Sequence, residues 1–107
     1  MAKIVRGLVD DTVQSIKEAL DKYEATHPGA SADLYRQNNA SIRVRVIDRR
    51  FEGMTKSRRH DQVWDFLTAH LADDILPDVS LLLAVAPAEL GGSLINLEFE
   101  QPTHSAL

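Results

Sequence analysis

Apolar residues recur at helical spacing in two parts of the chain. Near the start, the steps between them are four, three, four and three, at Val9, Val13, Ile16, Leu20 and Tyr23. That period gives a helix one apolar face. Asp10 and Asp11 are suited to open this helix, and His27-Pro28-Gly29 ends it, because the residue before a proline is pushed out of the helical region. The second part predicts a helix whose apolar face is wide enough to cover a sheet, at Val63, Trp64, Phe66, Leu67 and Leu71.

The segment between these helices has the pattern of a β-hairpin. Ala32–Gln37 is a short predicted strand, Asn38-Asn39 a turn, and Ser41–Ile47 a longer strand in which apolar and polar residues alternate. Asparagine tolerates the left-handed backbone conformation that tight hairpin turns require. The loop length leaves two registers open, with Tyr35 opposite Ile42 or Leu34 opposite Val44.

Two further strands are predicted after the second helix. Val79–Ala86 is an almost continuous apolar run between two prolines, which is typical of a strand within a sheet. Ser93–Glu100 alternates apolar and polar residues and is the predicted last strand. Met1–Val9 is interpreted as an arm leading into the first helix. We expect flexible termini over about residues 1–8 and 101–107.

The predicted element order is therefore α-β-β-α-β-β. A crossover through the second helix makes the strands Ser41–Ile47 and Val79–Ala86 parallel, whereas the hairpin strands are antiparallel. Both helices have one apolar face, so they should cover the same side of a mixed sheet. The fold class is α+β, with two layers in a single domain over residues 1–107.

Composition excludes several kinds of chemistry. The 107 residues contain no cysteine, so this chain alone offers no disulfide, zinc ribbon or cysteine-ligated cluster. The sequence has no apolar run long enough to span a bilayer, which makes no membrane partner and a cytoplasmic location the expectations. The net charge is −4, but the charges are unevenly distributed. Residues 43–60 hold seven of the twelve Lys and Arg, while residues 61–107 hold eight acids and neither Lys nor Arg.

The basic residues form a candidate anion or nucleic-acid site. Lys56, Arg58 and Arg59 lie at the predicted start of a helix, where backbone N–H groups favour a phosphate and cations are otherwise unfavourable. Arg43 and Arg45 on the preceding strand would extend the site along a nucleic-acid backbone. The alternative, which we prefer, is that acids of the chain neutralise these cations as ordinary ion pairs, with Asp61, Asp65 or the acidic C-terminal strand as the partners.

Catalysis has the weakest support. His60, Asp61 and Asp65 are close in sequence, but no spacing typical of a metalloenzyme accompanies them. Ser57 with His60 lacks the groups that orient a nucleophile and stabilise an oxyanion. We expect no catalytic residue, no metal site, no cofactor and no enzyme. His60 is interpreted as ordering the turn through the backbone near Gly53, and Arg59 as a packing and hydrogen-bonding residue.

The stretch from Phe51 to Leu71 resembles the BolA-like family. The residues that carry the resemblance are Phe51, Gly53, Arg59-His60, Val63-Trp64, Leu67 and Leu71. The family pattern is F-x-G, five residues, then R-H, V-Y and leucines at helical spacing, with tryptophan here in place of the tyrosine. The resemblance implies a class II KH-like fold and a small non-enzymatic regulator. It also implies an association with monothiol glutaredoxins, iron–sulfur cluster handling and transcriptional stress responses.

The chain departs from this family pattern at three places. The usual His-Ala-Leu falls at Pro77-Asp78-Val79, so its histidine is absent. The long first hairpin loop, where many members keep a His or Cys, is reduced to Asn38-Asn39. These are the positions implied to hold a shared cluster, so we expect no cluster ligation by this chain. The final strand Ser93–Glu100 is unusual too, because family members more often continue as a helix or tail.

The expected function is therefore binding of a partner protein, with a monothiol glutaredoxin-like protein as the partner implied by the resemblance. The first alternative is a KH-like module that binds nucleic acid through the basic turn and strand face. The second is a homo-oligomeric structural module, in which the edge strand Ser93–Glu100 pairs across a two-fold axis.

Overall fold

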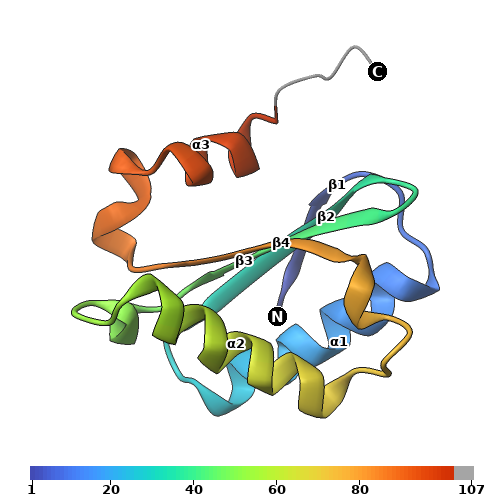
Figure 1. Cartoon of the computed structure of the whole chain (residues 1–107), viewed down its shortest axis with the longest axis horizontal. Coiled ribbons are helices and arrows are strands. Elements are labelled where there is room, and N and C mark those ends of the chain that lie inside the picture. Colours follow the sequence, from blue (N-terminus) through green and yellow to red (C-terminus); the bar gives the residue numbers. More distant parts are fainter. Residues whose placement is uncertain (103–107) are drawn as a thin grey trace.

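A computed structural model describes residues 1–102 of the chain (Figure 1). Its helices and strands follow one another as β1 (Lys3–Arg6), α1 (Asp11–Thr26), β2 (Ser31–Asn38), β3 (Ser41–Ile47), α2 (Lys56–His70), β4 (Val79–Val85) and α3 (Leu94–Glu100). Three short 3₁₀ helices connect them: η1 (Arg49–Phe51), η2 (Leu76–Asp78) and η3 (Pro87–Gly92).

The four strands form one mixed sheet in the order β1-β2-β3-β4. β2 and β3 pair antiparallel, while β1 runs parallel to β2 and β4 parallel to β3. α1 and α2 lie on one side of the sheet and α3 lies on the other (Figure 1). The predicted α+β class, the mixed sheet and the parallel crossover through α2 are confirmed.

The prediction for the N-terminal residues is wrong. Met1–Val9 is not an arm with flexible residues 1–8, because Lys3–Arg6 forms β1 and pairs in parallel with β2. Gly7 then turns the chain toward α1 with a φ of 84°. A four-residue strand has too little pattern to recognise, and its partner lies beyond a whole helix in the sequence. The expected flexible end over 101–107 falls, from residue 103 onward, outside the described residues.

The prediction of a last strand is also wrong. Ser93–Glu100 is not a strand, since Leu94–Glu100 forms α3 and the Oγ of Ser93 caps it by accepting a hydrogen bond from the Asn96 N–H at 3.1 Å. Asn96 and Phe99 are buried against the sheet, which is the helical spacing of three. A homodimer that pairs this segment as an edge strand is therefore ruled out by the fold.

The hairpin adopts the second of the two registers left open by the sequence. Leu34 lies opposite Val44, and Asn38 lies opposite Ser41. The loop itself has only two residues, and an irregularity between Arg36 and Asn38 supplies the extra residue. The alternation of β3 therefore places its apolar side chains toward α1 and α2.

Side chains pack on both faces of the sheet. Under α1 and α2 the fully buried residues include the predicted apolar face of α1, with Val13, Ile16, Leu20 and Tyr23, together with Leu34, Val44, Phe51, Val63 and Leu67. The opposite face carries a smaller cluster under α3, formed by Tyr35, Leu83, Val85 and Phe99. Because both faces are covered, β3 is largely buried, whereas β4, at the edge of the sheet, is only partly buried.

Gly7→Ala is expected to lower the free energy of unfolding by more than about 2 kcal/mol, as measured by urea denaturation. An alanine with positive φ costs roughly 1–2 kcal/mol, and here the added Cβ would also lie 2.6 Å from the Arg36 carbonyl oxygen. The matched control is Gly29→Ala, where φ is 90° but no atom lies within 4 Å of the added Cβ. Equal losses in the two variants would contradict the close approach of Gly7 to β2.

Candidate functional site

The bend between β3 and α2 is held by local backbone contacts. The Phe51 side chain is fully buried, and its carbonyl accepts a hydrogen bond from the Met54 N–H at 3.0 Å. Gly53 has a φ of 80°, a conformation that side chains disfavour, so a glycine belongs here. Thr55 caps α2 by accepting a hydrogen bond from the Arg58 N–H at 3.2 Å. Of the two predicted caps, Thr55 and Ser57, the first is the one used.

Arg59 connects this bend to the carboxyl end of β4, the edge strand of the sheet. Its Nε donates to the Met54 carbonyl at 3.1 Å, and its Nη1 reaches the Ala84 carbonyl at 3.5 Å. Both Nη atoms bind the two carboxylate oxygens of Glu89, at 2.5 and 2.8 Å. Glu89 in turn accepts a hydrogen bond from the Ala86 N–H at 3.0 Å. The interpretation of Arg59 as a structural residue is confirmed.

The Arg59 guanidinium lowers the pKa of Glu89 from 4.5 to about 2, because the hydrogen bonds and the positive charge favour the ionised carboxylate. The same pair raises the pKa of Arg59. Arg59 is thus neutralised within the chain by a residue of η3, the segment that leads into α3.

The other members of the first turn of α2 are exposed. Lys56, Arg58 and His60 all face solvent, and the His60 ring lies roughly parallel to the Trp64 ring with a centroid distance of 6.0 Å. The bond to the backbone beside Gly53 that was expected of His60 is made by Arg59 instead. His60 is therefore a surface side chain beside the buried Arg59.

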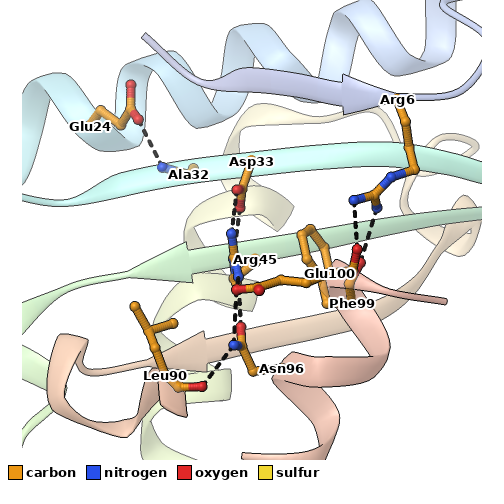
Figure 2. A network of polar contacts seen from close by, with 9 residues as sticks. All are labelled: Arg6, Glu24, Ala32, Asp33, Arg45, Leu90, Asn96, Phe99 and Glu100. Carbon is orange, nitrogen blue, oxygen red and sulfur yellow. Dashed lines mark hydrogen bonds and ion pairs between the residues drawn. The ribbon is translucent and has the colours of Figure 1, made fainter.

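Arg45 lies beneath α3 in the polar network of Figure 2. Its Nε and Nη2 bind both carboxylate oxygens of Asp33 on β2, at 3.0 and 2.6 Å. Its Nη1 donates to the Asn96 Oδ1 at 2.6 Å and to the Glu100 Oε1 at 2.7 Å. The guanidinium also lies over the Phe99 ring, 4.7 Å from its centroid. Only 9% of Arg45 is exposed.

The charges in this network shift one another's pKa. Burial disfavours the charged form of Arg45, but its hydrogen bonds to Asp33 and Glu100 outweigh this effect, so the pKa of Arg45 is raised. The same contact with Arg45 lowers the pKa of Glu100. Arg45 and Glu100 therefore both stay ionised at neutral pH.

Two more arginines hold α3 to the sheet. Arg6 on β1 donates to the Phe99 and Glu100 carbonyls, at 3.0 and 2.9 Å (Figure 2). These are carbonyls of the last helical turn, which have no partner within the helix. Arg43 donates to the Tyr35 hydroxyl at 3.1 Å and to the Glu98 carboxylate at 3.4 Å. Together with Arg45, these arginines attach α3 to the sheet from Asn96 to Glu100.

The structure divides the five candidate anion contacts between two faces of the sheet. Arg43 and Arg45 lie under α3, where Glu98, Asp33 and Glu100 neutralise them. The other three, Lys56, Arg58 and Arg59, lie at the start of α2, and Glu89 binds Arg59. The preferred interpretation, that acids of the chain neutralise basic ones, holds for Arg43, Arg45 and Arg59. The partners are C-terminal acids and Asp33, not Asp61 or Asp65.

Sequence reasoning missed the residues that receive these arginines, above all Glu89 and Asn96. The available signal was the charge asymmetry, with a basic middle and an acidic C-terminal part. It indicated that the two parts attract each other, but without a helix over Leu94–Glu100 it could not say which acid meets which arginine.

A groove follows β4 between the two helical layers. It has a volume of about 840 Å³ and is lined by the first turn of α2, by residues 81–85 and by the segment from Glu89 to Ile95. A second hollow of about 420 Å³ continues it toward Ser80, and the two share Leu81, Leu94 and Ile95. The groove is mainly apolar, and Leu94 at its rim is 83% exposed.

Within residues 1–102, the outer edge of β4 pairs with no other strand, because β4 ends the strand order. The same part of the chain contains no group of three or more His, Cys, Asp or Glu side chains able to hold a metal ion. None of its helices is both long enough and apolar enough to cross a lipid bilayer.

The positions that the BolA-like resemblance links to a cluster lie apart from the groove lining. Pro77 and Asp78 belong to η2, and Asn38 ends β2. No protein-family model matches the chain, and no curated protein is significantly similar to it.

Arg45→Met is expected to lower the free energy of unfolding by about 3 kcal/mol, because it leaves the Asp33 carboxylate and the buried Asn96 Oδ1 without their guanidinium partner. Methionine keeps the apolar stem against Phe99. The control is the exposed Arg49→Met, which should change stability by less than about 0.5 kcal/mol. Urea denaturation followed by circular dichroism compares them, and similar losses would show that Arg45 does not hold α3.

The Arg59–Glu89 pair should make stability depend on acid pH. A carboxyl whose pKa falls on folding stabilises the folded state above its unfolded pKa and loses that contribution as pH falls to the folded pKa. The difference in unfolding free energy between the wild type and Glu89→Gln should thus be largest above about pH 4.5 and vanish toward pH 2. Glu18→Gln, exposed on α1, corrects for the loss of one negative charge. A difference that does not change with pH would contradict the pairing.

Proposed function

We propose that this protein is a small non-enzymatic regulatory or adaptor domain that works by binding a partner protein in the groove along β4. The observation that carries the proposal is the open apolar groove beside an unpaired strand edge. Exposed apolar surface that lines a groove is typical of protein interaction sites. A cytoplasmic location, inferred from the absence of cysteine and of long apolar runs in the sequence, agrees with such a role.

The BolA-like resemblance supports the same function. Its motif residues Phe51, Gly53, Arg59 and His60 lie at the bend and at the start of α2, next to the groove. The family was expected to continue as a helix or tail after its last core strand, and α3 follows β4 here. The predicted final strand at Ser93–Glu100, which would have been unusual for the family, is therefore no longer a departure from the family pattern. The partner that the resemblance implies is a monothiol glutaredoxin-like protein.

Cluster ligation by this chain is not part of the proposal. The hairpin loop and the Pro77-Asp78-Val79 segment offer neither a histidine nor a cysteine. A complex with a glutaredoxin-like protein would therefore rest on protein–protein contacts and need no bridging ligand from this chain.

Nucleic-acid binding is the second candidate, favoured by the exposure of Lys56 and Arg58 at the start of α2. A phosphate backbone would compete with intramolecular carboxylates for Arg43, Arg45 and Arg59. Two exposed cations on a chain of net charge −4 give a weak electrostatic footprint. We therefore place binding of a partner protein first.

Leu94→Asp is expected to weaken binding of a monothiol glutaredoxin by about tenfold or more, because it places a charge on the apolar wall of the groove. Leu97→Asp is the matched control, since Leu97 is also exposed on α3 but does not line the groove. Isothermal titration of the three proteins measures the effect. A complex that is equally tight with all three would place the binding site elsewhere, and no complex at all would remove the glutaredoxin as partner.

A further inference from the structure

The outer edge of β4 presents unused backbone hydrogen-bonding groups. The Val85 carbonyl accepts a hydrogen bond from the Asp48 N–H at 3.1 Å, so Val85 faces β3. Because successive residues of a strand point their backbone N–H and C=O groups to opposite sides, those of Leu82 and Ala84 face outward. The register shifts between the pairs Ile42–Val79 and Arg43–Leu81, so this alternation does not extend to Ser80. Leu82 and Ala84 therefore carry donors and acceptors that no strand within residues 1–102 pairs.

One end of this edge is already capped. The Ala84 carbonyl meets Arg59 at 3.5 Å, and the Ala86 N–H binds Glu89 at 3.0 Å. The Arg59–Glu89 pair thus completes the edge at the carboxyl end of β4. The remaining open groups, the Ala84 N–H and both backbone groups of Leu82, lie alongside the groove.

The two edges of the sheet differ in their protection. β1 is four residues long and exposes Lys3 and Arg6, which discourages pairing with another strand. β4 is seven residues long and contains no charged residue. Natural sheets rarely leave such an edge unprotected, because it invites pairing with other chains. We therefore expect the β4 edge to be covered by a binding partner when the protein functions.

The groove has an apolar wall on one side of this edge and a mainly polar one on the other. Toward α3, Leu81 and Leu83 meet Leu94 and Ile95, of which Ile95 is 48% exposed. Toward α2, alternate residues of β4 belong to the main core, and the first helical turn closes the side. An added strand directs alternate side chains to opposite faces, so an extended chain would place every second side chain, an apolar one, against the wall toward α3.

The polar lining of the larger groove is basic. Glu89 is neutralised by Arg59, and among the described residues it is the only acid in this lining. Lys56 and His60 remain beside it, at the start of α2. An acidic side chain near this end would therefore meet positive charge.

We propose that an extended segment of a partner protein adds to the outer edge of β4 as a fifth strand, with apolar side chains in the groove and an acidic residue beside Lys56. This inference rests on the proposed function and specifies how the partner binds. A second copy of the chain would have to bring its own α2 and α3 into a groove that these elements already border. A single extended segment needs only the width of one strand.

The test begins with a displayed library of random linear peptides of ~10 residues, about the greatest common strand length. Peptides that bind the wild-type protein are selected, and those that also bind the Leu94→Asp variant are removed. The enriched sequences should contain apolar residues at every second position and an acid toward one end. One enriched peptide, made with a fluorescent label, is then the probe for all further measurements.

Backbone pairing is tested on this peptide by methylating its amide nitrogens at alternate positions. One set of positions faces β4 and the other faces solvent, so one methylated peptide should lose about tenfold or more in affinity and the other should bind as before. Amide hydrogen exchange followed by NMR should slow at Leu82 and Ala84 when the unmodified peptide binds. Equal binding of both methylated peptides, or unchanged exchange at both amides, would overturn strand addition.

Charge recognition is tested with Lys56→Glu, which should weaken the same peptide several-fold and more strongly at low salt. Lys22→Glu, exposed on α1 away from the groove, is the control with the same change of net charge. Equal effects of the two variants would show that binding does not need an acidic residue of the peptide beside Lys56. If the selection enriches no linear peptide over the Leu94→Asp background, the inference is overturned. This holds even if Leu94→Asp still weakens a complex with a partner protein. Light scattering that shows a wild-type dimer and a Leu94→Asp monomer would assign the groove to a second copy.

Discussion

Two buried guanidinium groups need negative partners, and that need determines where the C-terminal part of the chain folds. Arg45 and Arg59 are 9% and 5% exposed, so neither can rely on water for solvation. Asp33 of β2 is one partner of Arg45, and the other acids come from beyond β4: Glu100 from α3 and Glu89 from η3. An unpaired buried charge costs several kcal/mol, whereas a paired one is close to neutral. The basic middle and the acidic C-terminal part of the sequence reflect these pairings.

The sequence predicted those parts of the fold that rest on local signals. The face of α1, the alternation of β3, the bend at Gly53 and the crossover to β4 follow from spacing, turn chemistry and chain direction. β1 could not be predicted, because four residues carry little pattern and their pairing depends on a close approach at Gly7. The bulge that sets the hairpin register likewise depends on tertiary contacts.

α3 shows why a pattern of period two can mislead. Ile95, Leu97 and Phe99 alternate with polar residues, but only Phe99 of the three is buried. The residues facing the sheet are chosen by Arg45, which requires the Asn96 amide and the Glu100 carboxylate beside it. Similarly, the sequence position of Arg59 was enough to predict that it lies at the start of α2. Its partner Glu89 could be identified only from the structure, because the course of η3 brings it to Arg59. The sequence indicated that its basic and acidic parts attract each other, but it did not indicate which acid pairs with which arginine.

The same requirement also builds the groove. A helix that turns Asn96, Phe99 and Glu100 toward the sheet must turn Leu94 and Leu97 toward solvent, so part of its apolar surface stays exposed. Leu94 then stands beside the open edge of β4 as an apolar wall. Each Å² of apolar surface left in water forgoes about 25 cal/mol of stabilisation. Burying polar groups at the cost of exposing leucines is therefore unfavourable for the isolated domain, and a partner that covers those leucines would recover the difference. The internal pairing of Arg45 thus produces the surface to which we assign binding.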